Sequence, residues 1–113
     1  MDRKDRIRLY KGSPRRAGVY RIRNTVRSKS LLGSSPDLHG IFNRHRFQLA
    51  LGSHPVRTLQ KDWKELGEGA FVFEILDEMK PSDEPGGNPA EDLAALMQLW
   101  REKLAEEGEA FYE

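Results

Sequence analysis

A histidine flanked by two arginines is the segment of this chain whose residue types most directly suggest chemistry. Asn43-Arg44-His45-Arg46 lies in a stretch whose apolar residues recur at helical spacing. Arginine forms strong, charge-assisted hydrogen bonds with phosphate oxygens, so Arg44 and Arg46 beside His45 favour contact with a phosphate group. The alternative is that both arginines form a solvated helix face and that His45 is a structural histidine near an apolar surface.

Two serines stand directly before this helical stretch. Ser34 and Ser35 precede Pro36, and proline is well tolerated in the first turn of a helix. Ser35 is then the expected N-cap. The same position would allow the backbone N–H groups at the start of the helix to receive an anion.

The net charge of +1 conceals an asymmetry between the two parts of the chain. Residues 1–46 contain 13 Lys and Arg against 3 Asp, a balance of +10, and residues 47–113 contain 6 basic and 15 acidic residues, a balance of −9. This split favours a basic face that binds a polyanion and an acidic face turned elsewhere. The alternative is that the two parts neutralise each other across a solvated surface.

Length and composition indicate a single domain. A chain of 113 residues can bury one modest core, and we expect residues 1–113 to form one domain with a basic N-terminal extension at 1–16. The chain has no cysteine, which excludes disulfides and thiolate metal sites. It contains no apolar run of the roughly 20 residues that span a bilayer, and no signal-peptide pattern at its start. We therefore expect a soluble, cytoplasmic protein.

The apolar pattern predicts an α+β fold. Val19 to Arg23 alternates as a half-buried strand does, residues 24–29 supply polar turn residues, and 30–34 complete an antiparallel hairpin. Residues 70–76 are aromatic and β-branched, which indicates a third strand. The predicted order is ββααβα, a three-stranded antiparallel sheet flanked by helices.

Glycines and prolines set the expected limits of the three helices. The first follows Pro36 and ends at Gly52, and the second runs from about residue 55 to 66, before Gly67. Residues 80–88, rich in proline, glycine and acids, form the expected loop. The third helix opens at residue 88 or 89 and carries an apolar face composed of Leu93, Leu96, Met97, Trp100 and Leu104.

The two predicted strands carry a pair of short motifs that resemble a known family. The first strand contains Gly18-Val19-Tyr20, and the second contains Leu31-Leu32-Gly33, followed by the helix with His45. This arrangement resembles the GIY-YIG nuclease superfamily, and in particular the N-terminal domain of phage homing endonucleases. The resemblance covers nearly the whole chain from Ala17 onward and implies a three-stranded antiparallel sheet flanked by helices.

The resemblance also implies a set of catalytic residues. In GIY-YIG nucleases a tyrosine of the first motif helps to activate the water that attacks a phosphodiester, and Tyr20 matches it. His45 and His54 match histidines of the family. A phenol has an unperturbed pKa of about 10, so it needs a cation or a water network nearby to act as a base near neutral pH. Judged from the residues alone, Tyr20 could equally be a half-buried aromatic, and His54 a neighbour of a helix cap.

Three positions depart from the family pattern. Leu31 stands where the family has a second tyrosine, Ile41 where it has an arginine that supports the phosphate, and Met97 where it has a glutamate that holds a divalent cation, usually Mg²⁺. Arg44, one helical turn after Ile41, could replace the arginine. Candidate substitutes for the metal ligand are Glu74, Glu91 and Asp92.

The combined interpretation is a nuclease-like domain that binds nucleic acid, DNA more than RNA, with phosphodiester cleavage weak, altered or lost. The alternatives are an inactive protein-interaction module and an active, metal-dependent endonuclease that uses substitute residues. Mg²⁺ is the cofactor that the resemblance implies. The catalytic candidates are Tyr20, His45 and His54, and the candidates for nucleic-acid binding are Arg21, Arg23, Arg27, Lys29, Ser34, Ser35, Arg44 and Arg46.

Overall fold

The computed structural model describes residues 16–79 and 89–112. The predicted loop at 80–88 and almost all of the predicted N-terminal extension lie outside these residues. No helix in the described part of the chain is both long enough and apolar enough to cross a membrane.

The predicted hairpin is present. Strand β1 (Ala17–Asn24) pairs antiparallel with β2 (Lys29–Ser35), and Tyr20 faces Gly33 across the pair. The side chain of Asn24 closes the turn, because its Oδ1 accepts hydrogen bonds from the backbone N–H groups of Val26 and Arg27, both at 3.0 Å.

In the described residues the sheet has four strands, one more than the sequence predicted. Strand β3 (Phe71–Met79) pairs antiparallel with β1, as expected, and β4 (Ala110–Phe111) pairs parallel with β2, which gives a mixed sheet in the order β3-β1-β2-β4. The prediction of a three-stranded, wholly antiparallel sheet was therefore wrong in this detail. A strand of two residues is too short to show the alternation by which strands are predicted.

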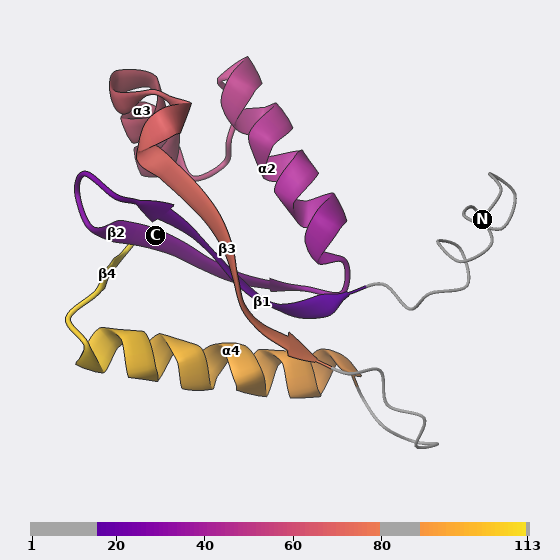
Figure 1. Cartoon of the computed structure of the whole chain (residues 1–113). Helices are drawn as coiled ribbons and strands as arrows, with labels where there is room; N and C mark the ends of the chain where they lie inside the picture. The colour runs from indigo at the N-terminus through magenta and orange to yellow at the C-terminus, as the bar shows by residue number, and fades with distance from the viewer. Residues whose placement is uncertain (1–15, 80–88, 113) are drawn as a thin grey trace, which may run out of the picture.

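Three helices of the described chain cover the two faces of the sheet. α2 (Leu38–Leu51) and α3 (Arg57–Leu66) lie on one face, and α4 (Pro89–Glu106) lies on the other (Figure 1). A short 3₁₀ turn, η1 (Glu68–Ala70), leads into β3. The α+β class is as the sequence predicts, and each of the three helices begins within two residues of its predicted start.

Alternation along β1 divides the core into two clusters. Tyr20 and Ile22 belong to the cluster under α2 and α3, which also contains Leu38, Leu49, Leu59, Phe71 and Tyr112. Val19 belongs to the cluster under α4, together with Leu32 and Leu104. Successive residues of a strand point to opposite faces, so neighbours in the sequence serve different layers.

Helix α2 begins two residues later than expected. Asp37 is its N-cap, and the Asp37 Oδ1 accepts the N–H of Gly40 at 3.1 Å. Ser35, the predicted N-cap, instead bonds through its Oγ to the backbone of Asp37. A cap side chain must reach the N–H groups two or three residues ahead, and Asp37 is the residue so placed. Gly52 ends the helix in the left-handed conformation with φ of 78°.

Candidate active site

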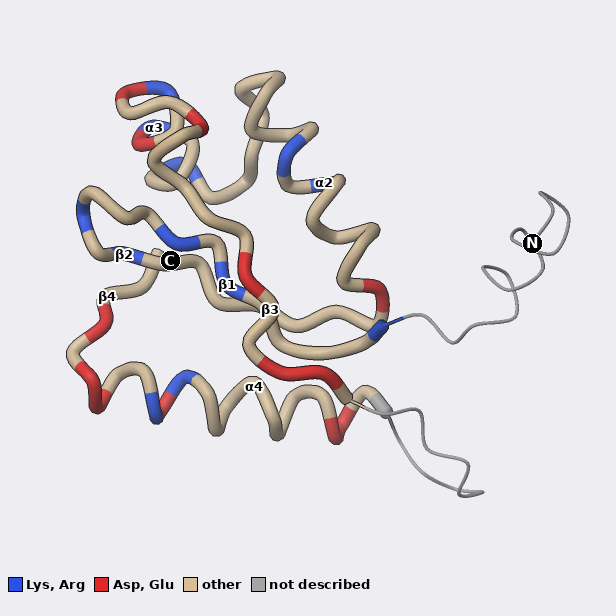
Figure 2. Tube along the Cα trace, in the orientation of Figure 1, with Lys and Arg blue, Asp and Glu red and all other residues tan. Residues whose placement is uncertain are grey.

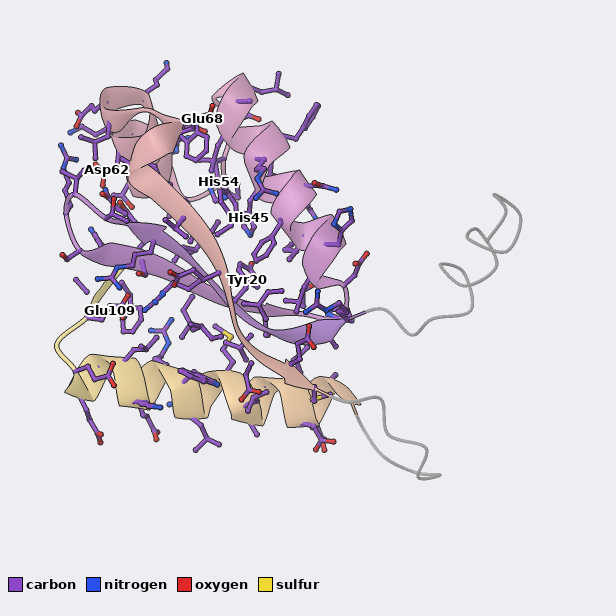
Figure 3. The ribbon with its side chains drawn as sticks, in the orientation of Figure 1. Tyr20, His45, His54, Asp62, Glu68 and Glu109 are labelled. Carbon is purple, nitrogen blue, oxygen red and sulfur yellow. The ribbon has the colours of Figure 1, made fainter. Side chains whose placement is uncertain are left out.

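Tyr20, His45 and His54 form one buried hydrogen-bonded chain, here called the Tyr–His–His triad. The Oη of Tyr20 lies 2.7 Å from the Nε2 of His45, and the Nδ1 of His45 lies 2.7 Å from the Nε2 of His54. The three side chains come from β1, from α2 and from the segment between α2 and α3, and they meet between the sheet and α2 (Figure 3). The structure thus brings together all three residues predicted to be catalytic.

The backbone beyond His54 assigns the direction of these hydrogen bonds. The N–H of Val56 donates to the Nδ1 of His54 at 3.0 Å, so that nitrogen carries no proton. A neutral imidazole has one N–H, and therefore the Nε2 of His54 donates to His45. By the same rule the Nε2 of His45 donates to the phenol oxygen of Tyr20. The triad presents an N–H to this oxygen, an arrangement that would stabilise a phenolate.

Burial keeps the triad neutral near pH 7. The exposed fractions are 5% for Tyr20, 9% for His45 and 4% for His54. Loss of contact with water raises the pKa of Tyr20 to about 12. Burial, together with the nearby His54 and Arg44, lowers the pKa of His45 to about 4, and burial lowers the pKa of His54 as well. A catalytic pair must be reached by its substrate, but the side chains of Tyr20 and His45 are both enclosed.

The glycine of the second motif is required by the tyrosine of the first. A Cβ added at Gly33 would lie 2.5 Å from the Cζ and the Oη of Tyr20, closer than nonbonded atoms approach. The ring of Tyr20 therefore occupies the space that a side chain at Gly33 would need. The tyrosine of the first motif and the glycine of the second are therefore linked by a steric requirement.

Two of the three departures from the family pattern lie on the same side of the sheet as the triad. Leu31 and Ile41, which replace a tyrosine and an arginine, both pack against the core cluster that contains Tyr20. Hydrocarbon thus stands where the family resemblance calls for a hydroxyl and a cation. This packing adds apolar surface to the cluster in which Tyr20 is buried.

The third departure lies in the other layer. Met97 packs against the cluster formed by Val19, Leu32 and Leu104, below the sheet, whereas Tyr20 lies above it. Mg²⁺ binds hard oxygen ligands, and a thioether is not one. Within residues 16–79 and 89–112, no three His, Cys, Asp or Glu side chains are grouped to hold a metal ion. The residues at this position do not fit the Mg²⁺ that the resemblance implies.

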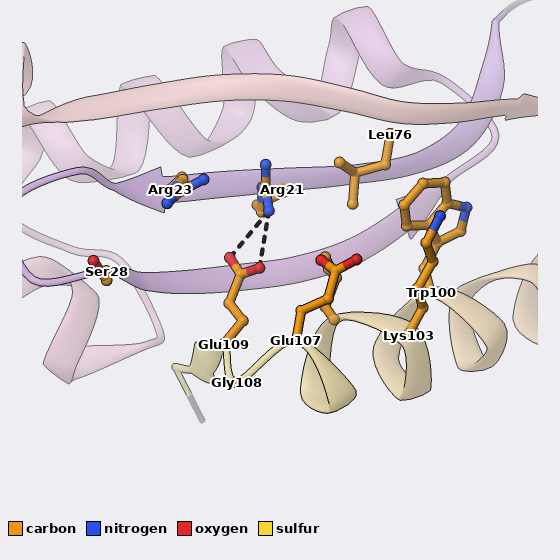
Figure 4. A pocket seen from close by; sticks show the side chains of 10 residues that line it. Arg21, Arg23, Ser28, Leu76, Trp100, Lys103, Glu107, Gly108 and Glu109 are labelled. Atoms are coloured by element: carbon orange, nitrogen blue, oxygen red, sulfur yellow. Dashed lines mark hydrogen bonds and ion pairs between the residues drawn. The ribbon is translucent and has the colours of Figure 1, made fainter.

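Of the candidates for nucleic-acid binding, Arg21 is held in an internal ion-pair network. Its guanidinium bonds the carboxylate of Glu74 at 2.5 and 2.8 Å. It also bonds the carboxylate of Glu109 at 2.9 and 3.1 Å (Figure 4). Arg21 and Arg23 line a cavity of about 420 Å³ against α4, beside Trp100. The charge of Arg21 is already balanced by two carboxylates.

The charge of Arg27 is balanced in the same way. Arg27 pairs with Asp62 and with Glu65 of α3. Asp62 also accepts the hydroxyl of the buried Tyr112 at 2.5 Å, which ties β4 to α3. Arg16 pairs with Glu78. Part of the charge asymmetry in the sequence is therefore neutralised between the basic and acidic parts of the chain.

The other candidates are spread over several elements. Lys and Arg positions occur along β1, β2, α2, α3 and α4 (Figure 2). Arg44 is exposed on α2, and Arg46 lies with its guanidinium 4.3 Å from the ring centre of Phe73. Lys29 lies 4.8 Å from the ring centre of Tyr112. The hydroxyl of Ser35 is engaged with Asp37, and Ser34 is half-buried in β2. Their binding of nucleic acid stays a prediction.

Two residues that position the triad were missed at the sequence level. Val56 orients His54 through its N–H, and Gln60 accepts the backbone N–H of His54 at 3.1 Å while donating to the carbonyl of Leu49 at 3.1 Å. Gln60 is the signal that could have been followed, because an amide between the apolar Leu59 and Trp63, one helical turn into α3, can bond the preceding loop.

Comparison with known proteins supports a nuclease-type fold. No family model matches the chain. The intron-associated endonuclease 1 of Enterobacteria phage T4 is 33% identical over 64 residues, which are 57% of this chain and 26% of the phage protein. The chain thus spans about a quarter of that relative.

Solved structures give a match over most of the chain. The catalytic domain of the homing endonuclease I-TevI superposes with a TM-score of 0.66 at 25% identity, covering 85% of this chain and 95% of that domain. A mutant of the same domain gives a TM-score of 0.67 at 24% identity, covering 87% and 92%. The resemblance predicted from the two short motifs is confirmed: this chain has the fold of the I-TevI catalytic domain, a GIY-YIG homing endonuclease domain.

Proposed function

We propose that this chain is a nuclease-like domain that binds nucleic acid, DNA more than RNA, in which phosphodiester cleavage is weak, altered or lost. The observation that carries this proposal is the state of the triad. Tyr20, His45 and His54 keep a geometry suited to proton chemistry, yet only 5% of Tyr20 is exposed, and Leu31 and Ile41 add hydrocarbon to the cluster that contains it.

The chemistry of a phosphodiester sets what the triad would have to do. The attacking water must lose a proton and the developing charge must be met. A phenol with a pKa of about 12 is ionised in only about one molecule in 10⁵ at pH 7. His45 donates an N–H toward the phenolate, but Ile41 supplies no charge for the phosphate. These features favour slow cleavage or none.

Mg²⁺ remains a proposal that rests on the family resemblance alone. The side chain of Met97 has no oxygen, and Glu74 is paired with Arg21. Glu91 and Asp92 lie in the exposed first turn of α4. The cytoplasmic location likewise stays a prediction.

Two assays test the proposed function. Fluorescence anisotropy with labelled duplex DNA and RNA should give salt-dependent binding, tighter for DNA, because released counterions drive phosphate contacts. Incubation with supercoiled plasmid, with and without Mg²⁺, should give little nicking. Efficient Mg²⁺-dependent nicking that disappears in Tyr20→Phe would instead establish an active endonuclease. Absence of binding at low salt would overturn the proposal.

A protein-interaction module is the second candidate, and one observation favours it. Phe47 and Leu51 lie one turn apart on α2 with exposed fractions of 65% and 64%. Exposed apolar pairs of this kind occur at protein contacts. DNA binding that weakens steeply with salt would decide against this candidate as the main function.

A further inference from the structure

Three cations of α3 line a cavity that adjoins the triad. Arg57, Lys61 and Lys64 recur at four and three residues, so they share one face of the helix. With Ser53, His54 and Gln60 they line a cavity of about 650 Å³. We call this surface the α3 groove.

Among residues 16–79 and 89–112, no carboxylate lines the α3 groove. Asp62 and Glu65, the acids of α3 that follow Lys61 and Lys64 in sequence, both form ion pairs with Arg27 of the hairpin turn. Within the part of the chain that the structure describes, Arg57, Lys61 and Lys64 form no ion pair. The groove therefore presents three positive charges that the domain itself does not balance.

The wall of the groove is held in place. Gln60 bonds both the carbonyl of Leu49 and the backbone N–H of His54, which fixes the segment between α2 and α3 against α3. His54 is 4% exposed and is anchored at both ring nitrogens, by Val56 and by His45. A site with a fixed wall loses little entropy when a ligand binds.

The spacing of the cations suits a nucleic-acid strand. From Arg57 to Lys64 the helix rises about 10.5 Å. One strand of B-DNA advances about 3.4 Å along its axis per phosphate, so this length corresponds to about three phosphates. By contrast, Arg21 and Arg27 of the hairpin form ion pairs with carboxylates of the domain itself.

We propose that the α3 groove, and not the basic hairpin, holds the sugar-phosphate backbone of one nucleic-acid strand, with the strand running past His54. This inference rests on the proposed function, since it names where the polyanion binds. It also places the bound strand at the His54 end of the triad.

Matched double variants of the full chain test the groove. Lys61→Gln with Lys64→Gln removes two groove charges, and Arg101→Gln with Lys103→Gln removes two charges from α4. Binding of a short fluorescein-labelled duplex is measured by anisotropy over a range of salt concentrations, and circular dichroism verifies folding. The groove variant should bind about tenfold more weakly and lose up to about 1.8 from the salt slope. The α4 variant should stay within about twofold of the parent.

The outcomes separate failure of the groove from failure of the function. If the parent chain binds no nucleic acid, the proposed function and this inference both fail. If the parent binds and the two double variants weaken equally, only the groove assignment is overturned. Fluorescein-labelled polyglutamate serves as a competing probe: binding as tight as that of the duplex, lost in the same groove variant, would identify an acidic protein partner and overturn the inference.

Discussion

The ring of Tyr20 lies where the side chain of its cross-strand partner Gly33 would begin. The two residues face each other in the β1–β2 pair, and a Cβ at Gly33 would meet the Cζ and the Oη of Tyr20 at 2.5 Å. The ring is held on its other sides by Phe42, whose ring centre lies 5.4 Å away, and by His45. The position of the hydroxyl is thus set by packing.

Substitution of Gly33 tests this steric relationship. Gly33→Ala should lower the free energy of unfolding by about 1–3 kcal/mol, because the ring of Tyr20 must move off its position. Gly69→Ala is the matched control, since a Cβ there meets no atom within 4 Å. Urea unfolding of both variants provides the measurement. Equal stabilities would show that the ring moves freely.

Removal of the phenol oxygen tests the hydrogen bond to His45. Tyr20→Phe should cost about 1–2 kcal/mol of unfolding free energy, because the buried N–H of His45 would lose its acceptor. The ring itself remains, so packing is conserved. A variant as stable as the parent would contradict the assigned direction of the bond.

The histidines of the triad should make the fold sensitive to mild acid. The pKa of His45 is about 4 in the folded chain and about 6.5 when unfolded, so the unfolded state binds more protons between these values. Stability is then complete above pH 6.5 and should fall by about 1–1.5 kcal/mol between pH 7.5 and 5.5. His54, whose pKa burial also lowers, acts in the same direction.

Urea unfolding at several pH values measures this dependence. His45→Gln should flatten the profile, whereas His39→Gln, a change at an exposed position of α2, should keep it. A parent profile that stays level down to pH 5.5 would sink the prediction.

A carboxylate at position 97 should not restore catalysis. Met97→Glu places a charge against Val19 and Leu104 and should destabilise the fold by about 1–3 kcal/mol. Leu99→Glu, at a side chain with 63% exposure on the same helix, should cost much less. Plasmid nicking with Mg²⁺ should stay at the parent level in both variants. Cleavage by Met97→Glu would show that α4 contributes to the site of Tyr20.

Substitution of Arg21 distinguishes a structural role of this residue from a role in binding nucleic acid. Arg21→Gln leaves Glu74 and Glu109 facing each other without their cation and should destabilise the fold by about 2–3 kcal/mol. Because the charge of Arg21 is internally balanced, affinity for duplex DNA should change by less than about twofold. A large loss of affinity in a stable variant would return Arg21 to the binding surface.

Local patterns were sufficient to predict the elements, because alternation and helical spacing are written in consecutive residues. Strand β4 was not predicted because its two residues, Ala110 and Phe111, are too few to show an alternating pattern. Tyr20, His45 and His54 were found through their resemblance to a family. The partners of Arg21 were not found, because Glu109 lies 88 positions away and only the folded sheet brings it near.

The burial of the triad gives it a second reason to persist in evolution. Tyr20, His45 and His54 satisfy one another's polar atoms inside the core, so a loss at any of them would cost stability whether or not the domain cuts nucleic acid. Residues that act only on a substrate lack this protection. We therefore expect Tyr20, His45 and His54 to tolerate substitution less well than residues that contact only a substrate, whatever the domain does to nucleic acid.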